Sequence, residues 1–126
     1  MTKHVPVVHL SVMLDVARDL RSLTTGRSNE DIASTDLLGM AVPGGLGRLG
    51  VTAARVPADW RNRTSRIDWF KIVDLGRHVI HDYDAIDFDR VVHAVGRLPV
   101  LVETLTEALA KLPEGTAATS SVAAPP

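Results

Sequence analysis

Apolar residues recur at the spacing of an α-helix along most of this chain, and no segment alternates apolar and polar residues as a half-buried strand would. The clearest case is the segment 88–112, in which valines and leucines return every three or four residues and Pro99 predicts a kink. Because 126 residues suffice for one ordinary domain, these helices must share one core. The sequence therefore predicts an all-α fold, an up-and-down bundle of four to five helices.

The N-terminal part of the chain predicts two helices. Apolar and charged residues at helical spacing indicate a first helix over 7–23, ended near Gly26. Ser28, followed three residues later by Asp31, resembles a helix start, because an acidic side chain is favourable beside the free amides of a first turn. We expect a second, shorter helix from there to about Met40.

A glycine-rich stretch interrupts this helical pattern. Pro43 and five glycines fall within 39–50, and each disfavours the interior of a helix. We expect a break or loop there, after which the apolar pattern resumes and a buried helix follows over 67–83. The domain should extend over 1–112, and the small, polar, proline-terminated segment 113–126 should be a disordered tail.

Composition limits the possible partners. Fourteen Lys and Arg against 15 Asp and Glu give a formal charge of −1, so a nucleic acid would have to be bound by a local basic cluster. Arg61, Arg63 and Arg66 form such a cluster in a predicted exposed loop, which is equally well read as a solvated linker. The absence of cysteine excludes disulfides and thiolate metal sites. With no apolar run of about 18 residues and no leader sequence, we expect a cytoplasmic protein without a membrane span.

The segment 67–109 contains an ordered series of distinctive residues: Ile67, Trp69, Ile72, Leu75, His81, Tyr83, Ile86, Asp87, Leu98 and Pro99. This series resembles the HepT-like toxin family of the HEPN superfamily. That family has a Trp- and Ile-rich lead-in, a Leu-Arg-Asn step, a His-x-Tyr run, a Val/Ile-Asp step and a helix interrupted by Leu-Pro. Further upstream, 46–60 and 13–28 resemble two earlier helices of the family.

The resemblance implies a HEPN-like bundle that acts as an enzyme. It implies a metal-independent ribonuclease, the toxin of a type VII-like toxin–antitoxin pair, that needs no cofactor. It further implies a homodimer whose two sites face one another across a cleft and share the RNA substrate. The partner would be an MntA-like nucleotidyltransferase antitoxin, which attaches adenylate to the tyrosine at the position of Tyr83.

One departure concerns the catalytic pair itself. The family places arginine five residues before the histidine, where this chain has Gly76, while its own arginine is Arg77, four before His81. Four residues of helix turn by about 40° and five by about 140°, so Arg77 should lie nearly above His81. Histidine can move a proton near neutral pH, and arginine can stabilise charge on phosphorus. Arg77 and His81 are therefore the predicted catalytic residues, and a catalytically impaired partner of a nucleotidyltransferase is the alternative.

These residues also have ordinary structural explanations, and two further kinds of site are possible. His81 could be an ordinary surface histidine, Tyr83 a residue at the edge of the core, and the whole chain an unrelated helical scaffold. Gly45 to Gly50 formally match the dinucleotide fingerprint G-x-G-x-x-G, but no strand precedes them. A metal site built from His78 and His81, with Asp74, Asp82 and His93 near them, has no independent ligand cluster to support it, so no metal is expected.

Overall fold

The computed structural model describes residues 4–34 and 36–111, and within these ranges it contains helices and no strand. The predicted all-α fold is thereby confirmed. Two short helices accompany five longer ones, and the predicted last helix is divided at Arg97, with Pro99 in the first turn of its second half. The helices are α1 (His4–Thr24), α2 (Asn29–Ile32), α3 (Leu37–Ala54), α4 (Ala58–Asn62), α5 (Trp69–His81), α6 (Phe88–Gly96) and α7 (Leu98–Ala110).

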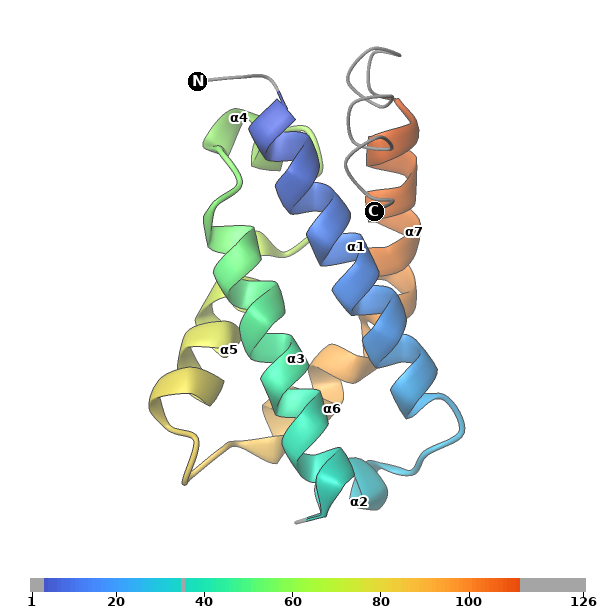
Figure 1. The fold of residues 1–126 in the computed structure, drawn as a ribbon, viewed down its shortest axis with the longest axis vertical. Coiled ribbons are helices and arrows are strands. Elements are labelled where there is room, and N and C mark those ends of the chain that lie inside the picture. Colours follow the sequence, from blue (N-terminus) through green and yellow to red (C-terminus); the bar gives the residue numbers. More distant parts are fainter. Residues whose placement is uncertain (1–3, 35, 112–126) are drawn as a thin grey trace, which may run out of the picture.

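The longer helices run up and down beside one another, with α3 near the middle (Figure 1). α3 packs most extensively against α5 on one side and against α1 on the other, and α1 packs in turn against α7. One continuous core joins these helices. Its most deeply buried side chains are Leu10, Met13, Ile32, Leu98, Leu105, Val7, Val42 and Val91.

The expected break within 39–50 is wrong, because α3 runs without interruption through Pro43 and the glycines that follow it. The expected second helix is correspondingly too long, since α2 ends at Ile32. The predicted tail 113–126 lies outside the described residues.

Close packing explains why the glycine-rich sequence is helical. A Cβ atom on Gly45 would lie 2.5 Å from Leu20 Cδ2, and one on Gly50 would lie 2.7 Å from the Cα atom of Gly76. Glycine therefore allows α1 and α5 to approach α3 more closely than any other residue would. Tertiary packing of this kind supplies most of the stability of helices in proteins, and here it outweighs a poor local propensity.

Side-chain caps define where the two helices of this region begin. The predicted start at Ser28 is confirmed: its hydroxyl accepts a bond from the Asp31 amide at 3.0 Å, and the Asp31 carboxylate accepts one from the Ser28 amide at 3.2 Å. Asp36 caps α3 by accepting a bond from the Leu38 amide at 3.0 Å. The Ser34 hydroxyl donates to the same carboxylate and lowers the pKa of Asp36.

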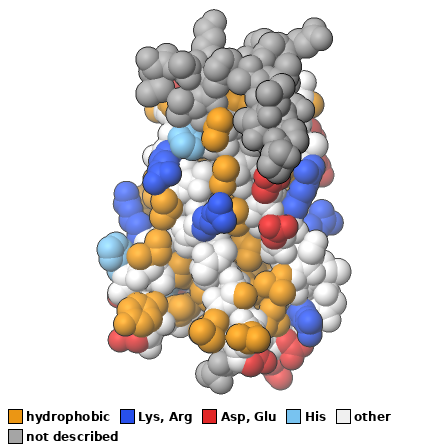
Figure 2. Space-filling view, viewed as in Figure 1, with side chains coloured by type: hydrophobic (Ala, Val, Ile, Leu, Met, Phe, Trp, Pro, Cys, Tyr) orange, Lys and Arg blue, Asp and Glu red, His pale blue; other side chains and the backbone are white. Residues whose placement is uncertain are grey.

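By length and composition α3 is apolar enough to cross a membrane, which the sequence analysis did not anticipate. Half of this 18-residue helix is buried inside the bundle. Its apolar character is that of a central helix, covered by α1 and α5 on opposite sides. Figure 2 shows hydrophobic side chains gathered over the lower part of the face that α1 and α3 form, where Leu37 and Met40 of α3 are exposed.

The contact between α3 and α5 gives a prediction with a matched control in the same helix. In Gly50→Ala the new methyl group meets backbone atoms of α5, which no rotamer change can relieve. Overpacking of about 1–3 kcal/mol should exceed the gain in helix propensity of about 1 kcal/mol. Gly44→Ala adds its methyl group in open space and should stabilise by about 0.5–1 kcal/mol. Urea unfolding of the two variants should thus give shifts of opposite sign; stabilisation by Gly50→Ala would contradict the contact.

Candidate active site at the end of α5

The C-terminal part of α5 carries both predicted catalytic residues. Arg77 and His81 stand one helical turn apart, and both side chains are exposed. Within the described residues neither has a hydrogen-bond or ion-pair partner, so both are free to bind a ligand. Tyr83 follows in the turn after α5 with 76% of its surface exposed, and its hydroxyl is open to modification.

His78 holds that turn in place. Its Nε2 atom accepts a hydrogen bond from the Asp87 amide at 2.9 Å, so the proton of the neutral ring must lie on Nδ1. Nδ1 then donates to Asp82 Oδ2 at 3.1 Å. One imidazole therefore joins both ends of the segment 82–87, in which Tyr83 lies.

Asp87 extends this arrangement to the next helix. Its carboxylate caps α6 by accepting bonds from the amides of Asp89 and Arg90, at 3.1 Å and 3.4 Å. The amide of Asp87 donates to His78 at the same time. The direction of α6 is thus fixed relative to the end of α5, and this explains why an acidic residue is needed where the sequence has its Ile-Asp step.

Arg77 faces a hollow of about 560 Å³ between the end of α3, the α4 region and α5. The same hollow is lined by Arg61, so the structure brings together one predicted catalytic residue and one predicted RNA-binding residue. Trp69 and Phe70 add aromatic surface to its wall. His81 does not line this hollow.

The predicted arginine loop is partly helical, and each of its three arginines has a partner. Arg61 belongs to α4 and is half-buried: its guanidinium donates to the carbonyls of Val56 and Ala53, at 2.9 Å and 3.0 Å, and lies over the Trp69 ring. It therefore satisfies carbonyls at the C-terminal end of α3. The expectation of an exposed loop is wrong for this residue.

The other two arginines remain exposed. Arg63 lies 5.3 Å from the centre of the Trp60 ring. Arg66 reaches α7, where it pairs with Glu103 at 3.1 Å and with Glu107 at 3.3 Å. Exposed pairs of this kind are weak, about 0–1 kcal/mol, so an incoming phosphate would be able to displace them.

Position 76, where the family has arginine, is closed in this protein. Gly76 is buried against α3, and a Cβ atom placed on it would lie 2.7 Å from the Cα atom of Gly50. An arginine introduced there would have to separate α3 from α5. Gly76→Arg would consequently test the folding of the bundle and would not restore a catalytic site.

In the structure, residues of the two alternative sites, the dinucleotide fingerprint and the metal site, have other roles. Gly45 to Gly50 lie in the middle of α3, where backbone amides are used by the helix and cannot cradle a phosphate. Asp74, one of the possible metal ligands, binds Arg90 at 2.8 Å, and His78 uses both ring nitrogens as described. The described ranges contain no group of three His, Asp or Glu side chains arranged to hold a metal ion.

Sequence reasoning missed the structural role of two residues. From the sequence, His78 was expected only as a possible metal ligand. Its position three residues before His81 gives no signal that it holds the turn after α5. Arg61 was expected to be either a phosphate contact or part of a solvated linker. Both structural roles depend on partners that the fold brings near, and no sequence pattern marks them.

The bonds of His78 yield a second prediction. His78→Ala should speed amide hydrogen exchange at Asp87 and cost about 1 kcal/mol, because the amide loses its acceptor. His78→Gln offers a carbonyl oxygen near the place of Nε2 and should restore most of the protection. Unchanged exchange at Asp87 in His78→Ala, measured by NMR against a His81→Ala control, would argue against this role.

Comparison with known proteins identifies the family of this chain. Residues 13–115 match the family described as HepT-like, ribonuclease HepT-like. The match includes α3, α5 and the turn that bears Tyr83. No curated protein and no solved structure gives a significant match. Because the match covers most of the chain and the fold is the helical bundle that the family resemblance implied, this protein belongs to the HepT-like ribonuclease family.

Proposed function

We propose that this protein is a metal-independent endoribonuclease toxin in which His81 moves the proton and Arg77 stabilises the phosphate. The observation that carries the proposal is that Arg77 and His81 lie one turn apart on α5, both exposed and neither paired among the described residues, in a chain of a ribonuclease family. Both residue types suit the chemistry. The arginine is displaced by one position from the family pattern, yet it is placed nearly above the histidine by the turn of the helix.

In the proposed reaction His81 takes the proton of a 2′-hydroxyl while its oxygen attacks the adjacent phosphorus. The bond from phosphorus to the 5′-oxygen breaks, that oxygen takes a proton from water, and His81 returns its own proton to the solvent. The products are a 2′,3′-cyclic phosphate and a 5′-hydroxyl. Negative charge gathers on the non-bridging oxygens during this step, and the Arg77 guanidinium donates to them. Of the three predicted RNA-binding arginines, the exposed Arg63 and Arg66 would supply sequence-independent phosphate contacts. Arg61, whose guanidinium is bonded to two backbone carbonyls, would add positive charge to the hollow that it shares with Arg77.

We further propose a homodimer formed through the face of α5 that bears Arg77. Phe70 and Ile80 lie on this face and are 77% and 48% exposed. Exposed apolar residues around a charged pair favour burial by a partner surface. With a two-fold axis near this face, two copies of Arg77 and His81 would line one RNA-binding cleft.

A nucleotidyltransferase antitoxin is the proposed second partner, acting on Tyr83 in the cytoplasm. The exposure of the tyrosine and its position two residues beyond His81 support this role. An adenylate on Tyr83 would place a bulky anion beside the catalytic pair and exclude RNA by charge and volume.

A second candidate function follows from Gly76. Because the family arginine position is buried here, the chain could have lost cleavage and kept only the binding of a nucleotidyltransferase. The two functions differ in one measurable property, the cleavage of RNA by the purified protein.

The catalytic roles lead to a third prediction. His81→Ala should lower the rate of RNA cleavage by about 10²–10⁴-fold, because a general acid–base is lost, and Arg77→Ala should have a comparable effect. The assay uses purified protein, bulk tRNA and mRNA, and excess EDTA. His9→Ala and Arg18→Ala on α1 are matched controls that should cleave like wild type. If wild type cleaves no more than His81→Ala, the non-catalytic function is correct.

Tyr83 provides a fourth prediction. Tyr83→Phe should keep toxicity and cleavage but resist adenylylation by the partner, since only the hydroxyl is removed. Mass spectrometry of toxin co-expressed with the nucleotidyltransferase encoded beside it should show an added adenylate on wild type and none on the variant. Adenylate found on another residue of the variant would refute the assignment to Tyr83.

The proposed interface gives a fifth prediction. Phe70→Ser should weaken the dimer by about 10²-fold or more, because a two-fold interface loses two buried phenyl groups at about 1.5–3 kcal/mol each. Sedimentation analysis would measure this against Val8→Ser, which changes an exposed apolar site on α1. A wild-type protein that is monomeric at micromolar concentration would rule out the shared cleft.

A further inference from the structure

A second groove lies along α5, centred near Lys71, about 120° around the helix from Arg77. It is lined by Arg66 and Phe70, which the proposed ribonuclease also uses, but by neither Arg77 nor His81. It is formed between α5 and the α6–α7 segment, because α5 packs extensively on α3 but only slightly on α6. Its volume is about 770 Å³, within the range of about 300–1,000 Å³ that is usual for small-molecule sites. The aliphatic side chains that form its floor are Leu46, Leu49, Leu75, Leu98 and Leu101.

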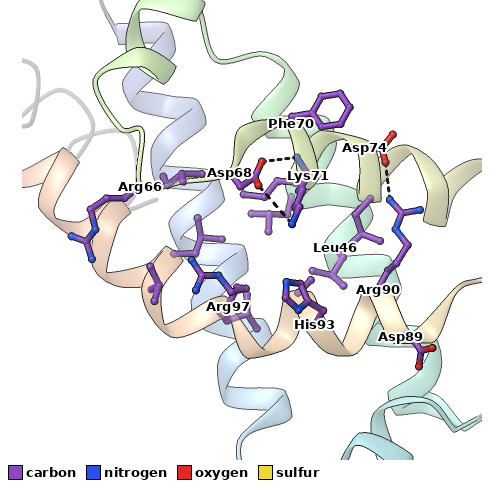
Figure 3. A pocket seen from close by; sticks show the side chains of 18 residues that line it. Leu46, Arg66, Asp68, Phe70, Lys71, Asp74, Asp89, Arg90, His93 and Arg97 are labelled. Atoms are coloured by element: carbon purple, nitrogen blue, oxygen red, sulfur yellow. Dashed lines mark hydrogen bonds and ion pairs between the residues drawn. The ribbon is translucent and has the colours of Figure 1, made fainter.

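Basic side chains converge on this groove from both sides. Figure 3 shows Lys71 directed from α5 toward the opening, with His93 and Arg97 rising from the opposite wall. His93 and Arg97 have no hydrogen-bond or ion-pair partner in the described part of the chain. Lys71 has only a long contact of 4.0 Å with Asp68.

The acidic residues of the groove leave this positive charge largely uncompensated. Asp74 is neutralised by Arg90 at 2.8 Å, and Asp68 accepts from the Lys71 amide at 3.2 Å as well as facing its ammonium group. Asp89 points away from the opening (Figure 3). An apolar floor under unpaired cations is suited to a ligand with an anionic head and an apolar body.

The shape of the lining distinguishes an aliphatic body from a nucleobase. Bases are held chiefly by stacking on aromatic rings. Phe70 is the aromatic residue among those that line the groove; it points away from the opening in Figure 3 and is 77% exposed. The remaining apolar lining consists of branched aliphatic side chains and one alanine, which form a surface for a hydrocarbon chain.

We propose that the groove between α5 and α6–α7 binds a free single-chain amphipathic anion. Its carboxylate or phosphate head would pair with Arg97, His93 and Lys71, and its aliphatic chain would lie on the leucine floor. Arg97 offers the strongest contact, since its guanidinium can bind a carboxylate through two parallel hydrogen bonds. Neither Arg77 nor His81 lines the groove, so the proposal does not depend on the ribonuclease function.

Titration calorimetry with sodium dodecanoate below its critical micelle concentration would test the site on the full chain. Wild type should bind one equivalent, and Arg97→Gln should weaken binding by at least about 10-fold, because one charge-assisted contact is lost. Ala94→Phe, which fills the groove without changing its charge, should also abolish binding. Arg18→Gln on α1 is the charge-matched control and should bind like wild type. Circular dichroism would verify the fold of each variant.

Two further probes separate this ligand from its competitors. Dodecanol should bind at least about 10-fold more weakly than dodecanoate, because it lacks the anionic head. Vesicles of anionic phospholipid should not bind in a way that depends on Arg97. Equal binding of dodecanol, no binding of dodecanoate at millimolar concentration, or Arg97-dependent binding to vesicles alone would each overturn the proposal. Occlusion of the groove by a second copy, seen as Ala94→Phe disrupting the dimer, would do so as well.

Discussion

The close approach of α3 and α5 at Gly50 and Gly76 is the contact on which the rest of the structure depends. Two glycines facing one another allow two helical backbones to touch, and α5 is held mainly by this contact. Packing of this kind explains most of the glycines in α3. A Cβ atom at Gly45, Gly47 or Gly50 would meet α1 or α5, so the conformational cost of these glycines is offset by packing that a larger residue would prevent. The approach of α3 and α5 also determines which faces of α5 remain free.

Because one face of α5 is used against α3, its other two faces are left for binding. One bears Arg77 and His81 with exposed apolar neighbours, and the other forms a wall of the leucine-floored groove. The replacement of the family arginine by glycine at position 76 has a physical meaning in this arrangement. An arginine there would face α3, whereas Arg77 faces solvent beside His81.

The end of α5 also shows how structural and chemical roles are divided between neighbouring residues. His78 uses both ring nitrogens to hold the turn, while His81, three residues later, keeps its nitrogens free. Arg61 is held by the carbonyls of Ala53 and Val56, while Arg77 in the same hollow has no partner within the part of the chain that the structure describes. Residues with a fixed partner position the site, and those without one are available to a substrate.

The sequence by itself determined the helical fold, the start at Ser28, the division near Pro99 and the family, because apolar periodicity, capping residues and the His-x-Tyr run are local patterns. It also identified Arg77 and His81 as neighbours, because a spacing of four residues places them one turn apart on the same face of a helix. The tertiary structure decided that 39–50 is helical and that Gly76 is closed to arginine. The reason is physical: both depend on the distance between the backbones of two helices that are far apart in the sequence, and local propensity does not determine that distance.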